Sequence, residues 1–143
     1  METRSAVVDV LGGSKVMGAM EDRVGVRTAV RSGLPYSAFE NVTSALSMSQ
    51  KDLARALSIQ PRTLSRRRTE GRFQATESDR LYRVARVLAH ARAVLGTMPL
   101  AAQWMTRPNR ALGGEEPIYL LDTDIGVQEV DDALGRIEHG IFG

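Results

Sequence analysis

The chain has 143 residues, no cysteine and two histidines. This length suffices for one domain, or for two small helical modules that share a core, but not for two independent domains of ordinary size. Without cysteine, disulfides and thiolate metal sites are excluded, and two histidines are too few for a zinc cluster of their own. No signal peptide and no apolar stretch of bilayer length is evident, so we expect a soluble cytoplasmic protein.

Charge is distributed unevenly along the chain, although the net charge is only +2. Residues 51–92 carry eleven basic and four acidic side chains, a net charge of +7. Residues 111–143 carry one basic and eight acidic side chains, a net charge of −7. A basic centre suits a polyanion, because each neutralised phosphate releases condensed counterions. The acidic C-terminal third cannot lie on the same phosphates, so we expect it to contact something else.

Residues 1–36 give the weakest pattern, and we expect a mixture of helix and loop there. A short apolar run covers residues 7–11, and Gly12-Gly13 is typical of a turn. Gly12-Gly13-Ser14-Lys15 resembles a phosphate-binding loop only superficially, because the second glycine spacing and a strong preceding strand are missing. A turn is therefore the favoured interpretation.

Two further helices are predicted within residues 37–95. Ser37 and Glu40 have the spacing of a capping box, which predicts a helix over residues 38–46. Thr76, with Asp79 three residues later, predicts the start of a longer helix that Gly96 ends. The apolar positions of that helix keep a period of about 3.6 residues; they are Leu81, Val84, Ala85, Leu88, Ala91 and Leu95.

A helix-turn-helix is predicted over residues 50–68. Ser49 can cap the first helix, and Pro61 is tolerated in the first turn of the second. In such units the second helix enters the major groove, where arginine can bridge guanine O6 and N7. The expected DNA-binding residues are Arg62, Thr63, Ser65, Arg66, Arg67 and Arg68. Arg68 is the one among them that is better suited to phosphate than to a base.

Two residues depart from the usual helix-turn-helix pattern. Ser58 stands in the turn, where glycine is frequent, and Arg67 stands where many such helices bury an apolar residue. Three more arginines, on the helix that follows, are expected to be solvated, because a helix with one buried face is usually polar on the other. They are Arg80, Arg83 and Arg86.

The C-terminal region is also predicted to be helical. Pro99 begins a helix that Pro108 closes, and a Gly113-Gly114 loop leads to a short segment at residues 117–121. Thr123 begins the last helix, which Gly140 ends. Its apolar stripe consists of Val127, Val130, Leu134 and Ile137. We therefore expect an all-α fold with a central helix-turn-helix and a helical C-terminal module, in which Trp104 belongs to the core.

A set of motifs in this module resembles a known family. The motifs are Trp104-Met105, Pro108-Asn109, Leu112-Gly113-Gly114 before Pro117, and Arg136-Ile137-Glu138-His139-Gly140. They resemble the toxin-binding domain of Xre/MbcA/ParS antitoxins, and residues 62–67 resemble the helix-turn-helix that members of this family carry. The resemblance divides the chain into an N-terminal segment (1–36), an Xre-like helix-turn-helix region (37–95) and a toxin-binding module (96–143).

The resemblance implies a partner and a function. The protein would be the antitoxin of a type II toxin-antitoxin system that covers the active site of an NAD-depleting RES-domain toxin and binds operator DNA to repress its own operon. The expected toxin contacts are Glu138, Gly140, Ile141, Phe142 and Gly143. An acidic helix with an apolar tip suits a basic cleft for a phosphorylated cofactor. We also expect a homodimer, since two-fold operators are read by dimers, and a larger complex with the toxin.

The sequence also bears on two other classes of protein. An enzyme is disfavoured, because the pairs Asp122 with Asp124 and Asp131 with Asp132 point to different helix faces and no partner histidine is evident. No cofactor is therefore expected. A stand-alone transcriptional regulator, whose C-terminal module binds a ligand or another protein, stays open. A RES-domain toxin encoded by the adjacent gene would favour the antitoxin.

Overall fold

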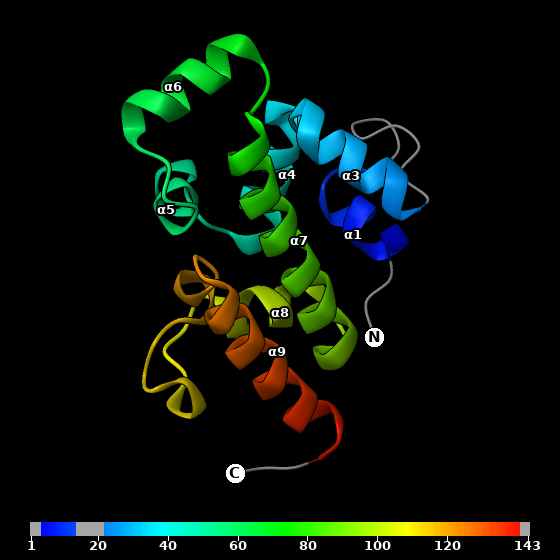
Figure 1. Ribbon diagram of the computed structural model, residues 1–143. Helices are drawn as coiled ribbons and strands as arrows, with labels where there is room; N and C mark the ends of the chain where they lie inside the picture. Colours follow the sequence, from blue (N-terminus) through cyan, green and yellow to red (C-terminus); the bar gives the residue numbers. More distant parts are fainter. Residues whose placement is uncertain (1–3, 14–21, 141–143) are drawn as a thin grey trace.

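The computed structural model describes residues 4–13 and 22–140, and their regular elements are helices (Figure 1). The elements are α1 (Arg4–Val10), α3 (Arg23–Ser32), α4 (Tyr36–Leu46), α5 (Gln50–Ala56), α6 (Pro61–Glu70), α7 (Ala75–Leu95), α8 (Met98–Met105), the 3-10 helices η1 (Arg110–Leu112) and η2 (Pro117–Leu120), and α9 (Asp124–Glu138). The predicted all-α fold is confirmed. In this described part of the chain, no helix has the length and apolar character needed to cross a membrane.

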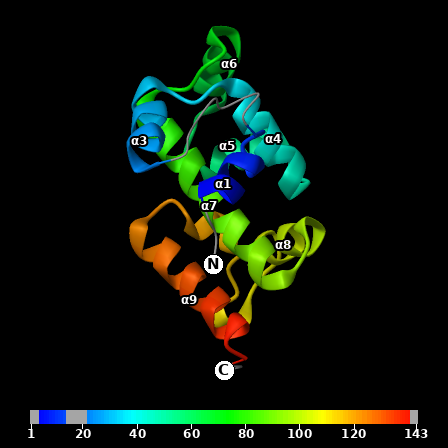
Figure 2. The same ribbon diagram turned by 90° about the vertical axis from the view of Figure 1, so that its right-hand side faces the viewer.

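Helix α7 is the element around which the other helices assemble. Its 21 residues correspond to a length of about 30 Å. It contacts α1 and α3 on the one hand and α8 and α9 on the other. Figures 1 and 2 show α6 at one end of the molecule and the last turn of α9 at the opposite end, with α7 running between them.

A single hydrophobic core joins the helix-turn-helix to the C-terminal helices. Its fully buried side chains include Phe39, Leu53, Leu81, Leu88, Met105, Ile118 and Leu134. Full burial of one such side chain contributes about 1.5 to 3 kcal/mol. Because α7 supplies residues to both parts of this core, neither part buries its apolar surface alone.

An aromatic cluster attaches the start of α4 to the turn between α6 and α7. The rings of Tyr36, Phe39 and Phe73 lie 5.4 Å apart, centroid to centroid, in each of the three pairs. The backbone N–H of Tyr36 donates to the carbonyl of Gly71, at 2.9 Å. The Leu34 N–H donates to the buried Ser78 hydroxyl, at 2.7 Å. These contacts fix the point from which α6 projects.

Two of the predicted helix caps are confirmed. The Ser49 hydroxyl accepts from the Asp52 N–H at the start of α5, at 3.0 Å. The Thr123 hydroxyl accepts from the Gly126 N–H at the start of α9, also at 3.0 Å. Each oxygen satisfies an amide that has no partner within its helix.

Two predicted helix starts are wrong by two residues. Helix α4 begins at Tyr36, after Pro35, and not at a Ser37 capping box. Helix α7 begins at Ala75, where Gln74 and Glu77 form the capping box that was assigned to Thr76 and Asp79. Bonds from Leu34 and Tyr36 to residues 71–78 hold the start of α4, and no local spacing reveals them. The capping box of α7 has the same local spacing as the predicted one but lies two residues earlier.

Among the described N-terminal residues, α1 and α3 pack on the rest of the molecule. Val7, Val10 and Leu11 are buried in the common core. Gly12 and Gly13 have positive φ angles of 120° and 78°, which confirms the predicted turn. Ser14 and Lys15 lie outside the described residues.

Helix α9 holds two glycines in contrasting surroundings. A Cβ on Gly126 would lie 1.8 Å from the Leu120 carbonyl oxygen, because α9 begins directly against η2. A Cβ on Gly135 would meet nothing within 4 Å.

We predict that Gly126→Ala lowers the free energy of unfolding, because the methyl group would force η2 away from α9. Gly135→Ala should raise it by about 0.5 to 1 kcal/mol, since alanine restricts the unfolded chain and favours the helix. Urea unfolding followed by circular dichroism measures both effects. Effects of the same sign in the two variants would contradict the close approach at Gly126.

Candidate nucleic-acid interface and C-terminal module

Helices α5 and α6 form the predicted helix-turn-helix. Ser58, in the turn between them, has a left-handed backbone with a φ of 57°, so serine here adopts the conformation that glycine usually supplies. The turn is closed by the Ile59 N–H, which donates to the Ala54 carbonyl at 2.8 Å. Leu53, Leu57 and Leu64 are buried between the helices and the body. The departure noted at Ser58 is therefore compatible with the motif.

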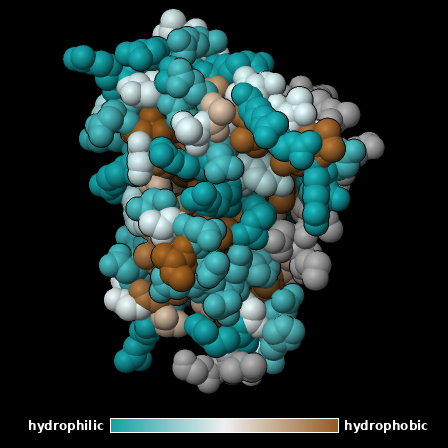
Figure 3. All heavy atoms as spheres, viewed as in Figure 1, coloured by the Kyte–Doolittle hydropathy of each residue, from teal (hydrophilic) through white to brown (hydrophobic). Residues whose placement is uncertain are grey.

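The outer face of α6 is polar and open. Arg62, Ser65 and Arg66 are exposed, and Thr63 is half-buried. Figure 3 shows a mostly hydrophilic surface at the end of the molecule that α6 forms. The structure therefore brings four of the six predicted DNA-binding residues to one accessible helix face.

A hollow of about 690 Å³ lies between α5 and α6. Polar residues that the sequence reasoning left out contribute to its lining: Gln50, Lys51 and Gln60. The motif itself could have identified the residues at the start of α5 as candidate phosphate contacts, since the first helix of such a unit crosses the DNA backbone.

Arg67 does not belong to the exposed face, which corrects the prediction for this residue. Its side chain is only 5% exposed. Its Nε donates to Oε1 of Glu77 at 2.7 Å, and its Nη1 donates to Oε1 of Glu70 at 2.9 Å. Arg67 occupies the inner position where an apolar residue is common, and the two carboxylates neutralise it there. It is therefore unavailable to DNA.

The pair of Arg67 and Glu77 depends on pH. Burial by itself raises the pKa of Glu77, but the hydrogen bonds from Arg67 and from the Gln74 N–H outweigh burial and hold the pKa below its ordinary value of 4.5. A lowered carboxyl pKa means that the fold favours the charged form. The resulting stabilisation is complete above the ordinary value and is lost as the pH falls through the lower pKa of the folded state.

Arg68 is exposed but oriented by neighbours on α4 and α5. Its Nη2 donates to Oε1 of Gln50 at 3.1 Å, and its Nε donates to the Tyr36 hydroxyl at 3.3 Å. Its guanidinium carbon lies 5.7 Å from the centroid of the Tyr36 ring. Arg68 therefore lies at the hollow between α5 and α6 and not on the outer face with Arg62.

The sequence predicted that the arginines of α7 are solvated, but the structure shows that they bind other parts of the protein. Arg80 donates to the Leu57 carbonyl at 3.2 Å, and Arg83 donates to the Leu121 carbonyl at 3.3 Å. The first bond holds the end of α5, and the second holds the residue after η2. These side chains therefore connect α7 to both halves of the protein.

Arg86 and a histidine of α7 meet an aspartate of α9. Nη2 of Arg86 donates to Oδ2 of Asp131 at 2.8 Å, and Nδ1 of His90 lies 3.0 Å from Oδ1. Burial alone raises the pKa of Asp131, but the bonds from His90 and Arg86 bring it below its ordinary value. The sequence analysis found no histidine partner for Asp131, and the structure supplies His90. This cluster attaches α9 to α7.

A direct contact also joins α5 to the C-terminal module. Arg55 donates from Nη2 to the Tyr119 hydroxyl at 2.7 Å, and its guanidinium lies 5.0 Å from the Tyr119 ring centroid.

Asn109 fixes the loop that precedes η2, because its side-chain oxygen accepts from the Ala111 N–H at 2.9 Å. Gly114 donates its N–H to the Asn109 carbonyl at 2.8 Å.

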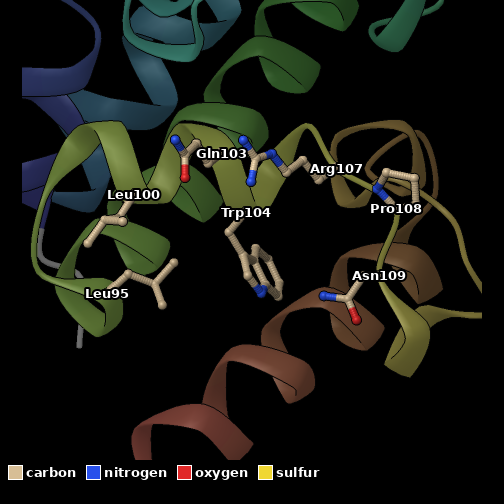
Figure 4. A pocket seen from close by; sticks show the side chains of 7 residues that line it. All are labelled: Leu95, Leu100, Gln103, Trp104, Arg107, Pro108 and Asn109. Atoms are coloured by element: carbon tan, nitrogen blue, oxygen red, sulfur yellow. The ribbon is translucent and has the colours of Figure 1, made fainter.

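Trp104 is less buried than predicted. Its side chain is half-buried and packs against the core, but it also lines an open cavity of about 300 Å³. We name this cavity the Trp104 hollow; its other lining residues include Leu95, Leu100, Arg107, Pro108 and Asn109. Figure 4 shows the indole projecting from α8, with the two leucines on one side of it and Pro108 and Asn109 on the other.

Two of the predicted toxin contacts, Glu138 and Gly140, lie at the end of α9. Glu138 is the last residue of that helix, and Gly140 follows with a φ of 70°. Both are exposed. Ile141, Phe142 and Gly143 lie outside the described residues. The described part of this predicted site is thus at the opposite end of the molecule from α6 (Figure 2).

The fold and these surfaces define a helix-turn-helix protein with a helical C-terminal module. The model of the antitoxin Xre-like helix-turn-helix domain matches residues 25–86. The model of the antitoxin Xre/MbcA/ParS C-terminal toxin-binding domain matches residues 90–140. The first match begins inside α3, and the two matches meet within α7.

Three curated relatives extend the comparison. Antitoxin Xre of Photorhabdus laumondii is 40% identical over 114 residues, which cover 78% of this chain and 77% of that protein. Antitoxin Xre of Yersinia enterocolitica is 36% identical over 116 residues, 80% of this chain and 78% of that protein. The Prs ADP-ribosylating antitoxin of a Sphingobium species is 28% identical over 131 residues, 85% of this chain and 80% of that protein. The chain belongs to the Xre antitoxin family.

We predict opposite consequences for two neighbouring arginines of α6. Arg67→Ala should lower the free energy of unfolding by about 2 to 3 kcal/mol, because it leaves the buried Glu77 carboxylate without its main partner. Arg66→Ala, on the exposed face, should change it by less than about 0.5 kcal/mol. Thermal and urea unfolding at neutral pH measure both values. A stable Arg67→Ala variant would contradict the assigned internal role.

Proposed function

We propose that this protein is the antitoxin of a type II toxin-antitoxin system. Its C-terminal module binds and neutralises a RES-domain toxin, and α6 binds operator DNA so that the protein represses its own operon. One observation carries the proposal: α6, in the matched helix-turn-helix domain, and the last turn of α9, in the matched toxin-binding domain, lie at opposite ends of one molecule. DNA and toxin can therefore be bound at the same time.

The proposed toxin consumes NAD. Depletion of NAD and transfer of ADP-ribose both break the bond between nicotinamide and ribose, so both need a cleft for the same phosphorylated cofactor. The name of the Sphingobium relative links that protein to ADP-ribosylation. A cleft that binds the phosphates of NAD is basic, and residues 111–143 carry a net charge of −7. We assign the contact to Glu138, Gly140, Ile141, Phe142 and Gly143.

The proposed operator contacts are confined to the accessible part of the helix-turn-helix. Arg62 and Arg66 bridge guanine, while Thr63 and Ser65 contact neighbouring base edges. Arg68 binds phosphate from its oriented position beside Gln50. Arg67 has no part in this interface, since its guanidinium is buried. Two copies of the chain would read a two-fold operator, so the proposal includes a homodimer and, with toxin, a larger complex.

We predict that Arg62→Ala and Arg66→Ala each weaken binding to the operator upstream of the gene by about 1 to 3 kcal/mol, because a bidentate contact to guanine is lost. Fluorescence anisotropy with a labelled duplex measures the affinity, and binding of the wild type should weaken steeply with salt. Arg92→Ala is the matched control, because Arg92 is exposed in the last turn of α7, away from α6. Equal affinity for all three variants would exclude the proposed base contacts.

We predict that deletion of residues 140–143 abolishes neutralisation of the toxin but leaves operator binding unchanged, because α9, which precedes them, ends at the opposite end of the molecule from α6. The readout is growth of cells that express a RES-domain toxin encoded beside this gene, together with either form of the chain. We expect the full chain to rescue growth and the shortened chain not to rescue it. Rescue by the shortened chain would contradict the assigned contact. Failure of the full chain to rescue growth would instead favour the stand-alone regulator.

A further inference from the structure

The Trp104 hollow is an apolar surface that the packing of the monomer leaves open. Leu100 is 48% exposed, one of three large apolar side chains among the described residues that stand out in this way. Trp104 and Leu95 beside it are half-buried. The exposed Arg107 adds a cation at the edge. An aromatic anchor with an adjacent arginine is the composition that dominates binding energy in protein interfaces.

The hollow is held rigid by the fold. Ala101, Ala102 and Met105 bury one face of α8 in the core, so Leu100 and Trp104, four residues apart, share the opposite face. The Thr97 hydroxyl caps the start of α8 by accepting from the Leu100 N–H, at 3.3 Å. Asn109 fixes the other edge through its loop bonds. A surface that is already ordered loses little entropy on binding.

We propose that the Trp104 hollow binds the toxin, as a second contact surface in addition to the C-terminal residues. This inference rests on the proposed antitoxin function. The matched toxin-binding domain covers residues 90–140. Every lining residue of the hollow lies within that range, whereas residues 141–143 lie beyond it. A domain described as toxin-binding therefore includes the whole hollow and leaves out the tip of the chain.

The size of a stable interface points to the same partner. A standard interface involves about 20 to 30 residues on each side and buries about 800 Å² per partner. The end of α9 and the tip, residues 138–143, supply too few residues for such an area. The toxin must therefore contact a further part of the module. The hollow offers the apolar centre that this interface needs, with Arg107 placed to pair with a toxin carboxylate.

One experiment uses Trp104 as the reporter, because it is the single tryptophan of the chain. The full chain is labelled with 5-fluorotryptophan, and the probe is the unlabelled RES-domain toxin encoded beside the gene. We expect the single fluorine resonance to shift or broaden on addition of toxin and to stay unchanged on addition of operator DNA, which binds at the opposite end. An unchanged resonance in a saturated toxin complex would overturn the inference.

A matched pair of variants tests the same surface by affinity. Leu100→Glu should weaken toxin binding by at least about tenfold, because it places a charge on the apolar side of the hollow, next to Trp104. Ile125→Glu should weaken it by less than about twofold, as expected for an exposed residue outside the contact. Ile125 is 63% exposed in the same module but does not line the hollow. Circular dichroism and operator binding confirm that both variants are folded.

The outcomes separate this inference from the proposed function. If the wild-type chain binds no RES-domain toxin, the proposed function fails. If the wild type binds but Leu100→Glu binds equally well, the hollow is excluded as a toxin contact, and the proposed function stands. A fluorine shift that follows protein concentration without toxin, with matching dimer formation in sedimentation, would assign the hollow to a second copy of the chain and overturn the inference.

Discussion

The orientation of α6 depends on one buried ion pair. Only Leu64 and Arg67 of this helix are buried, so α6 projects from the body with little apolar support. Leu64 packs by shape, but the bond between Arg67 and Glu77 has a fixed direction, at 2.7 Å. Glu77 also accepts from the Gln74 N–H, so the same carboxylate begins α7 and holds α6. The angle at which Arg62 and Arg66 are presented follows from this link.

Helix α7 then carries that geometry to the other end of the molecule. Arg80 reaches the end of α5, and Arg83 reaches the residue after η2, both through backbone carbonyls. A guanidinium that binds a backbone carbonyl fixes the position of the backbone, and this bond does not depend on the identity of the side chain at that residue. Together with the shared core, these bonds make the helix-turn-helix and the C-terminal module one body. A partner bound at the end of α9 would thereby be kept at a set distance from a partner bound at α6.

The sequence predicted what depends on local pattern and missed what depends on distant partners. The Ser49 and Thr123 caps and the apolar stripe of α7 need only neighbours in sequence. Both caps were predicted correctly, and five of the six predicted stripe positions are buried, while the sixth, Leu95, is half-buried. The start of α4 and the roles of four arginines depend on distant residues, which lie up to 45 positions away. Arg67 shows the difference best: its place three residues after Leu64 indicated an inner position, but nothing local identified Glu77 as its partner.

The family motifs of the C-terminal module separate, on physical grounds, into residues that the fold requires and residues that it leaves open. Gly113 and Gly114 have φ angles of 69° and 84°, so the backbone alone explains them. Asn109 is likewise explained by its loop bonds. Packing alone does not explain Trp104. An indole whose only role is packing is expected to be fully buried, whereas this one lines an open hollow. A large aromatic side chain that the fold positions but does not cover has contact area left for a partner.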